Sequence, residues 1–297
     1  MKRILLLIAL VATLFSCSKD QQLSSQMVDV KVALTGIDIQ VTPEDTRSTA
    51  SEAGVKRIAL SVYDLNGNLI QSATQNKDVD AANFGTPMTF RIPVGAYKFV
   101  AVAHTVAATT DPVATINSVT EFSLGSSLVG NPTFSTVQEG TISGNTTQTV
   151  TIDMGTRKNA TFKAKFTDDN PSDVTKIQLI VSHASTAYSD LKVNPSTGLA
   201  AAQWKYEKTF DLSTLPITTV KNNSFSVPLM LTAASQTLDV TVNALSATDE
   251  VLYTRTLTDV PLQQGHLTQA TGTFFSPIGT NTFSFDITEI TDNISLD

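Results

Sequence analysis

The sequence predicts an all-β protein built from two β-sandwich domains behind an export signal. Short segments in which apolar and polar residues alternate recur along the chain, turn residues separate them, and no segment sustains a helical apolar period. Hydrophobic residues make up 41% of the 297 residues and charged residues 16%, a balance that supports a packed core. Because one sandwich needs only about 100 residues, we expect two domains.

The N-terminal residues 1–16 have the form of a bacterial lipoprotein signal peptide. Two basic residues precede the apolar run Ile4–Phe15, which is shorter than the roughly 20 residues that a membrane-spanning helix needs. The run leads into Ser16-Cys17, which is similar to a lipobox, and we predict that Cys17 carries the lipid. Residues 18–22 behind it resemble the export signal of Bacteroidetes surface lipoproteins, without the usual acidic pair, and this resemblance implies the surface of the outer membrane as the location. An incidental thiol and a buried apolar cysteine are the alternatives for Cys17.

Charge and cysteine usage exclude several classes of function. The net charge of −7 and the pI near 4.9 argue against a nucleic-acid partner, which requires a clustered basic surface. A single cysteine excludes an intrachain disulfide framework. The three histidines, His104, His183 and His266, lie too far apart in the sequence for zinc-ligand spacing, and we expect them on the surface or at strand ends.

The chain divides into four parts on its sequence pattern. A polar tether over 17–27 follows the signal peptide, and a first sandwich is expected over 28–155. A second sandwich is expected over 156–297. The short polar stretch 155–158 marks the boundary between the two sandwiches.

The individual strands follow from period-two alternation and from the turns between them. A hairpin turn at Asn66-Gly67 separates two of them, because this residue pair tolerates positive φ. A single helical turn is expected near 111–118. The strands expected in the first domain are 28–34, 37–41, 56–64, 69–70, 88–92, 97–103, 121–124, 133–137 and 150–154. Those expected in the second domain are 159–166, 177–182, 225–231, 238–244, 251–257 and 267–275.

No catalytic motif is present in the sequence. It contains no Gly-x-Ser-x-Gly elbow, no His-Glu-x-x-His, no phosphate-binding glycine-rich loop and no Cys-His pair with an orienting acid. We therefore predict that the protein is not an enzyme and uses no cofactor. The segment 64–68 is interpreted as a hairpin turn, because its glycine stands fourth where a calcium loop requires it sixth.

Two further clusters have a structural and a functional interpretation each. Asp168-Asp169-Asn170 with Asp173 is typical of a solvated acidic turn, and a metal site is the alternative. Trp204, Tyr206 and Phe210 are expected to pack on the second domain, and an exposed aromatic platform for a sugar is the alternative.

Several segments taken in order resemble the Bacteroidales fimbrillin superfamily, which includes fimbrial stalk, tip and anchor proteins. The segments that carry the resemblance are the lipobox at Cys17, Thr46-Arg47-Ser48, 55–58 through 63–67, Ile92-Pro93-Val94-Gly95-Ala96-Tyr97, Arg157-Lys158-Asn159-Ala160, 262–268 and Gly272-Thr273-Phe274. The resemblance implies transthyretin-like Greek-key topology in both sandwiches and other fimbrial subunits as partners. It also implies a possible ligand on a host or bacterial surface.

The resemblance further implies processing and strand exchange. In stalk subunits a protease cuts after an arginine behind the first strands, and the matching pair here is Arg47-Ser48. Such a cut would displace 28–41, and a donor strand from a neighbour would fill the vacated groove. The displaced-strand candidates are Val28, Val30, Val32 and Leu34. The donor-strand candidates are Phe283, Phe285 and Ile287, within 281–290. An uncleaved Arg47 and an ordinary edge strand at 281–290 are the alternatives.

These observations predict a lipid-anchored fimbrial subunit or cell-surface adhesin that assembles by β-strand exchange. The alternative is a surface carbohydrate-binding lipoprotein of a nutrient-uptake system, which would bind polysaccharide as a monomer through exposed aromatic side chains.

Overall fold

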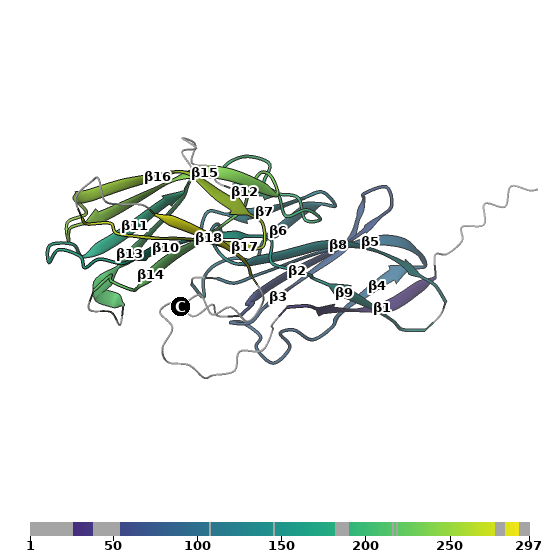
Figure 1. Cartoon of the computed structure of the whole chain (residues 1–297). Coiled ribbons are helices and arrows are strands. Elements are labelled where there is room, and N and C mark those ends of the chain that lie inside the picture. Colours follow the sequence, from purple (N-terminus) through teal and green to yellow (C-terminus); the bar gives the residue numbers. More distant parts are fainter. Residues whose placement is uncertain are drawn as a thin grey trace, which may run out of the picture.

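A computed structural model describes residues 26–37, 54–106, 108–144, 146–181, 190–215, 217, 219–276 and 283–290. Within these residues the chain is almost entirely β-strand, and the one helical element is a 3₁₀ turn, η1 (Leu212–Thr214). None of the described elements is a helix long and apolar enough to span a membrane. The all-β prediction is confirmed, and Figure 1 shows two sandwiches lying end to end.

The first sandwich packs a three-stranded sheet on a four-stranded sheet. In spatial order the smaller sheet contains β4 (Met88–Pro93), β1 (Met27–Thr35) and β9 (Gln148–Asp153). The larger sheet contains β3 (Leu69–Asn76), β2 (Arg57–Asp64), β5 (Gly95–His104) and β8 (Thr133–Ile142). β1 runs antiparallel to β4 and parallel to β9, so it lies between two partners.

The second sandwich repeats this strand order and adds one strand. One of its sheets contains β14 (Ser224–Leu229), β10 (Ala160–Phe166), β17 (His266–Gly272) and β18 (Ser284–Glu289). The other contains β13 (Tyr206–Asp211), β11 (Lys176–Val181), β15 (Ser235–Leu245) and β16 (Val251–Gln263). β10 is antiparallel to β14 and parallel to β17, as β1 is to β4 and β9. The extra strand is β18, and the transthyretin-like assignment stays a prediction.

A small third sheet connects the two sandwiches. It contains β12 (Asp190–Val193), β7 (Glu121–Gly125) and β6 (Thr115–Ser118), in that order. β7 pairs antiparallel with β12, which places Leu124 directly opposite Leu191. Both leucines are buried and belong to the hydrophobic core of the second sandwich. Segment 115–125 therefore precedes the predicted boundary in sequence and packs with the domain that follows it.

The polar stretch 155–158 is packed between the sandwiches. The Lys158 N–H donates to the Thr133 carbonyl at 2.9 Å, and the Thr133 N–H donates to Asn159 Oδ1 at 2.6 Å. Arg157 is only 4% exposed, and burial lowers the pKa of the Lys158 amine. The boundary position itself stays a prediction, but the C-terminal end of the segment is held by these contacts, while Gly155 and Thr156 are exposed.

Most of the expected strands are present, with three differences. The helical turn predicted near 111–118 is wrong, because residues 115–118 form β6 and the described helical turn is η1, whose N-terminus is capped by the Asp211 carboxylate. β12 and β13 were not predicted: β12 alternates but has only four residues, and β13 has charged or polar residues at four of its six positions. Most of the strand expected at 37–41 lies outside the described residues.

The hairpin predicted between β2 and β3 is confirmed. Gly67 has a φ of 85°, which favours glycine at this position. Asp64 accepts hydrogen bonds from the Asn68 N–H and from Asn68 Nδ2, both at 2.8 Å. The side-chain hydrogen bond from Asn68 lowers the pKa of the Asp64 carboxyl. The Asp64 carboxylate therefore finds its hydrogen-bond donors within the turn itself.

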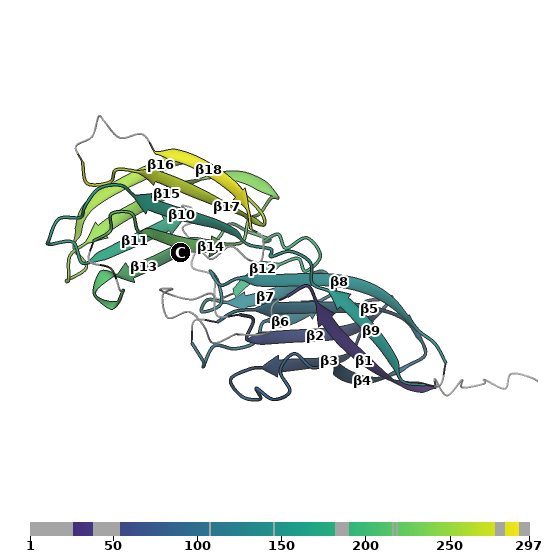
Figure 2. The same cartoon turned by 60° about the horizontal axis from the view of Figure 1, so that its bottom comes forward.

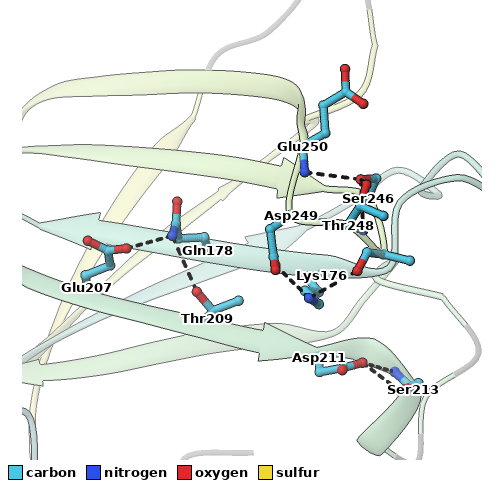
Figure 3. A network of polar contacts seen from close by, with 11 residues as sticks. Lys176, Gln178, Glu207, Thr209, Asp211, Ser213, Ser246, Thr248, Asp249 and Glu250 are labelled. Atoms are coloured by element: carbon cyan, nitrogen blue, oxygen red, sulfur yellow. Dashed lines mark hydrogen bonds and ion pairs between the residues drawn. The ribbon is translucent and has the colours of Figure 1, made fainter.

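The outer face of the second sandwich carries a polar ladder across four strands. Asn243 Nδ2 donates to Gln178 Oε1, and Gln178 Nε2 donates to Glu207 Oε1, both at 2.8 Å. Thr254 Oγ1 donates to Asn243 Oδ1 at 2.5 Å. Figure 3 shows the Gln178 and Glu207 pair, which bridges β11 and β13. This face is therefore lined by polar side chains that hydrogen-bond to one another across the strands.

Candidate functional site

The displaced-strand candidates lie together on the inner face of β1. Val28, Val30 and Val32 are buried in the core of the first sandwich, and Leu34 is half-buried against it. Because β1 pairs with a strand on each side, its removal would expose backbone N–H and C=O groups on both neighbours as well as an apolar groove. Displacement of β1 stays a prediction.

Two of the donor-strand candidates, Phe285 and Ile287, lie on β18, which pairs within its own chain, and the third, Phe283, directly precedes β18 and is partly buried against the second core. β18 runs antiparallel along β17, with Phe285 opposite Ala270 and Ile287 opposite Thr268. All six residues of β18 are exposed, including Phe285 at 37% and Ile287 at 46%. In Figure 2 this strand forms the yellow edge of its sheet. Backbone pairing holds β18 more than side-chain burial does.

Two side chains fix the chain at the end of β17, before it returns as β18. The Asp168 carboxylate accepts the backbone N–H groups of Phe274, Phe275 and Ser276 at 2.8, 2.6 and 3.0 Å. Arg255 Nε and Nη2 donate to the carbonyls of Phe274 and Ser276 at 2.7 and 2.5 Å. The expectation of a solvated acidic turn is therefore wrong for Asp168, because its partners come from a segment far away in sequence.

Asp169, the next residue in the sequence, pairs with a different part of the chain. Lys221 Nζ lies 3.1 Å from Asp169 Oδ2, and the hydrogen bond from Lys221 lowers the pKa of this carboxyl. In the part of the chain that the structure describes, no three His, Cys, Asp or Glu side chains are grouped so that they could hold a metal ion. The two carboxylates act as separate structural contacts.

His104 lies at the end of β5, one of the two positions expected for it, but its side chain is completely buried and not at the surface. Its Nε2 accepts the Ala114 N–H at 3.0 Å and its Nδ1 lies 2.9 Å from the Thr105 carbonyl, which fits a neutral ring with the proton on Nδ1. Burial lowers the pKa of the imidazole to about 4. His266 begins β17, with Nδ1 2.9 Å from the Gln264 carbonyl.

A buried arginine beside His104 was missed by the sequence analysis. Arg57 begins β2 with a completely buried side chain, and its Nη1 lies 2.8 Å from Asp78 Oδ2. Its Nε and Nη2 donate to the carbonyls of Asp111 and Thr109 at 3.0 and 2.8 Å. Nothing in the local sequence distinguishes Arg57 from an exposed strand-end arginine, because its partners lie 21 to 54 residues away.

The aromatic cluster of the second domain is packed and forms no exposed platform. Trp204 is 9% exposed and Tyr206 2% exposed. The Tyr206 hydroxyl donates to the Met230 carbonyl at 3.0 Å and accepts the Met230 N–H at 2.8 Å, and burial raises the pKa of the phenol. A hollow of about 360 Å³ lies between this region and segment 126–131. The packing interpretation is confirmed, and the sugar platform is wrong.

The predicted lipid and processing sites lie outside the described residues. Cys17 belongs to this group, as do Arg47, Ser48 and His183. Lipidation of Cys17 and cleavage after Arg47 stay predictions.

Fold and surface together define a class of protein: two β-sandwiches of matching strand order, the second extended by a C-terminal edge strand. The chain belongs to the family of fimbrillin-A associated anchor proteins Mfa1 and Mfa2, whose family model matches residues 24–287. The family is one of fimbrial anchor proteins and not of enzymes. This confirms the resemblance to the fimbrillin superfamily.

Similar solved structures come from Parabacteroides and Bacteroides species. A fimbrial assembly protein from Parabacteroides distasonis is 12% identical, with a TM-score of 0.46, over 89% of this chain and 99% of that one. A candidate cell adhesion protein from the same species is 11% identical, with a TM-score of 0.49, over 89% and 96% of the two chains. A candidate adhesin from Bacteroides ovatus is 14% identical, with a TM-score of 0.46, over 87% and 95%. No curated protein matches the sequence.

Proposed function

We propose that this chain is a lipid-anchored fimbrial anchor subunit, held on the outer membrane through Cys17 and joined to neighbouring fimbrial subunits by β-strand exchange. The observation that carries the proposal is the match to a family of fimbrial anchor proteins over residues 24–287. The signal-peptide pattern ending at Cys17 supports the anchor, because acyl chains hold a protein on a bilayer at about 0.8 kcal/mol for each buried CH₂.

β18 is the strand that we propose for exchange. Its side chains are exposed and its outer edge pairs with no described strand, so side-chain burial contributes little to holding it in place. Phe283, Phe285 and Ile287 alternate along one face, a pattern that suits an apolar groove in a neighbouring subunit. An unpaired edge of this kind is also a template on which another chain can add a strand.

The lipid anchor is tested by expressing Cys17→Ala in the native bacterium and separating membrane from soluble fractions. We expect the variant to leave the outer-membrane fraction while it stays folded. A Cys17→Ala protein that remains stably in the membrane fraction would overturn the anchor.

The strand contact is tested with the chain lacking residues 1–17, mixed with purified fimbrial subunits after low-dose trypsin. The double variant Phe285→Ser with Ile287→Ser should lose the complex on size-exclusion chromatography. A matched control carries Val251→Ser with Tyr253→Ser, which are also exposed but lie on β16. Equal binding by all three proteins would contradict a role for β18.

A further inference from the structure

Exposed apolar side chains gather at one end of the first sandwich. Ten large apolar side chains are exposed in the described residues, and four of them lie at this end: Met27 at 45%, Leu65 at 56%, Leu69 at 55% and Val94 at 41%. We call these four residues the distal tip. Scattered exposed apolar residues are ordinary, but a group of them on adjacent turns is typical of a surface that contacts another protein or a membrane.

The first half of the distal tip is built where β1 begins. Met27 stands opposite Pro93 in the β1–β4 pair, and the Val94 N–H donates to the Gln26 carbonyl at 2.9 Å. Met27 and Val94 therefore belong to one turn region, and the start of β1 lies at the end of the first sandwich that points away from the second (Figure 1).

The second half of the distal tip is the β2–β3 hairpin, which carries Leu65 and Leu69. Tyr97 connects this hairpin to the turn before β5, because it stands opposite Asp64 in the β2–β5 pair and its hydroxyl donates to the Pro93 carbonyl at 2.7 Å. The two turns thus lie at the same end of the sandwich, with apolar side chains projecting from each.

We infer that the distal tip rests in the interfacial layer of the outer membrane, beside the lipid on Cys17; the inference depends on the lipid anchor of the proposed function. Nine residues separate Cys17 from Met27, and even a fully extended chain of this length spans only about 35 Å. The anchor therefore keeps the start of β1 close to the bilayer. The end of the sandwich that faces the bilayer is the end that exposes the apolar side chains.

The distal tip offers lipid its apolar side chains, and the neighbouring carboxylate of Asp64 is already bonded to Asn68. Apolar side chains of proteins that lie on a membrane, such as those on the apolar face of an interfacial helix, enter the boundary between headgroups and acyl chains by about 5–10 Å. Vesicles of phosphatidylcholine and phosphatidylethanolamine, which carry no net charge, are therefore the probe.

The test uses fluorescent labels on single introduced cysteines in the full acylated chain, in which lipid occupies the one native cysteine. One protein carries the label at Val94→Cys in the tip. The control carries it at Val79→Cys, which is 81% exposed in the connection after β3, at the opposite end of the same sandwich. Vesicle flotation measures anchoring, and quenching by iodide measures the access of water to each label.

We expect both proteins to float, with a loss of iodide quenching at position 94 and none at position 79. Adding Leu65→Ser and Leu69→Ser should restore quenching at position 94 without preventing flotation. If the proteins float and both labels stay equally quenched, the tip inference is wrong and the anchor stands. If the unlabelled wild-type chain does not float, the anchor itself fails. Protection of position 94 without vesicles would show a contact between protein copies and would also overturn the inference.

Discussion

At the scale of single residues, His104 gives the protein a pH-dependent stability. Its pKa is lowered by burial to about 4 in the folded chain, against about 6.5 when unfolded. The unfolded state therefore binds more protons between these two values, and the free energy of unfolding falls as the pH drops through this window. A full shift corresponds to about 3 kcal/mol lost by pH 4.

The variant His104→Gln isolates this effect, because glutamine does not titrate and can still accept the Ala114 N–H. Urea unfolding at pH 7.5 and pH 4.5 should show a smaller loss of stability for the variant than for the wild type. The carboxylates titrate equally in both proteins and cancel in the comparison. If the free energy of unfolding fell equally in the variant and the wild type, protonation of His104 would not destabilise the folded state.

Arg57 is the second residue whose burial makes a prediction. Replacing it with methionine leaves Asp78 and the carbonyls of Thr109 and Asp111 without their donor, so we expect a loss of about 2–4 kcal/mol in the free energy of unfolding. The matched control is Lys98→Met, which breaks a more exposed 3.7 Å pair with Glu139 and should cost less than about 1 kcal/mol. Similar losses for the two variants would contradict the buried network.

At the scale of elements, the attachment of β18 is open to a steric test. A Cβ at Gly272 would lie 2.9 Å from the ring of Phe283, closer than packed atoms approach. Gly272→Val should therefore displace Phe283 and destabilise the β17–β18 pair by about 1–3 kcal/mol. Hydrogen exchange of the β18 amides measures this, with faster exchange expected in the variant.

The rescue variant distinguishes a clash from a general disruption of β17. Combining Gly272→Val with Phe283→Ala removes the ring and should slow the exchange of the β18 amides again. Exchange that stays fast in the double variant would place the damage in β17 and not in the contact with Phe283.

At the scale of the whole molecule, Leu124 belongs to the second core although it lies in the first half of the chain. Leu124→Ala should cost about 2–5 kcal/mol and should loosen β10 more than β2. The matched control, Leu60→Ala, removes an equally buried leucine from the core of the first sandwich and should loosen β2 first. Hydrogen exchange resolved by segment measures the loosening of β2 and β10 in each variant. If Leu124→Ala loosened β2 more than β10, segment 115–125 would not be part of the second core.

Local sequence determined the class of fold and most strands, because period-two alternation and turn residues act over a few neighbouring positions. The alternating valines of β1 and the Asn66-Gly67 turn are of this kind, and so is the signal-peptide pattern ending at Cys17. The resemblance that ran through these segments led to the fimbrial family.

Tertiary structure alone decided which side chains meet. The Asp168 carboxylate accepts the Phe274 N–H, although the two residues are 106 positions apart in the sequence. Arg57 is buried and donates to the carbonyl of Asp111, 54 residues away. The exposed Leu65 and Leu69 of the β2–β3 hairpin lie at the same end of the sandwich as the start of β1. No local pattern encodes such contacts, since they arise only when strands far apart in sequence pair in one register. The pairing of β18 with its own β17 belongs to the same group, because an alternating edge strand fits a neighbour's sheet as well as its own.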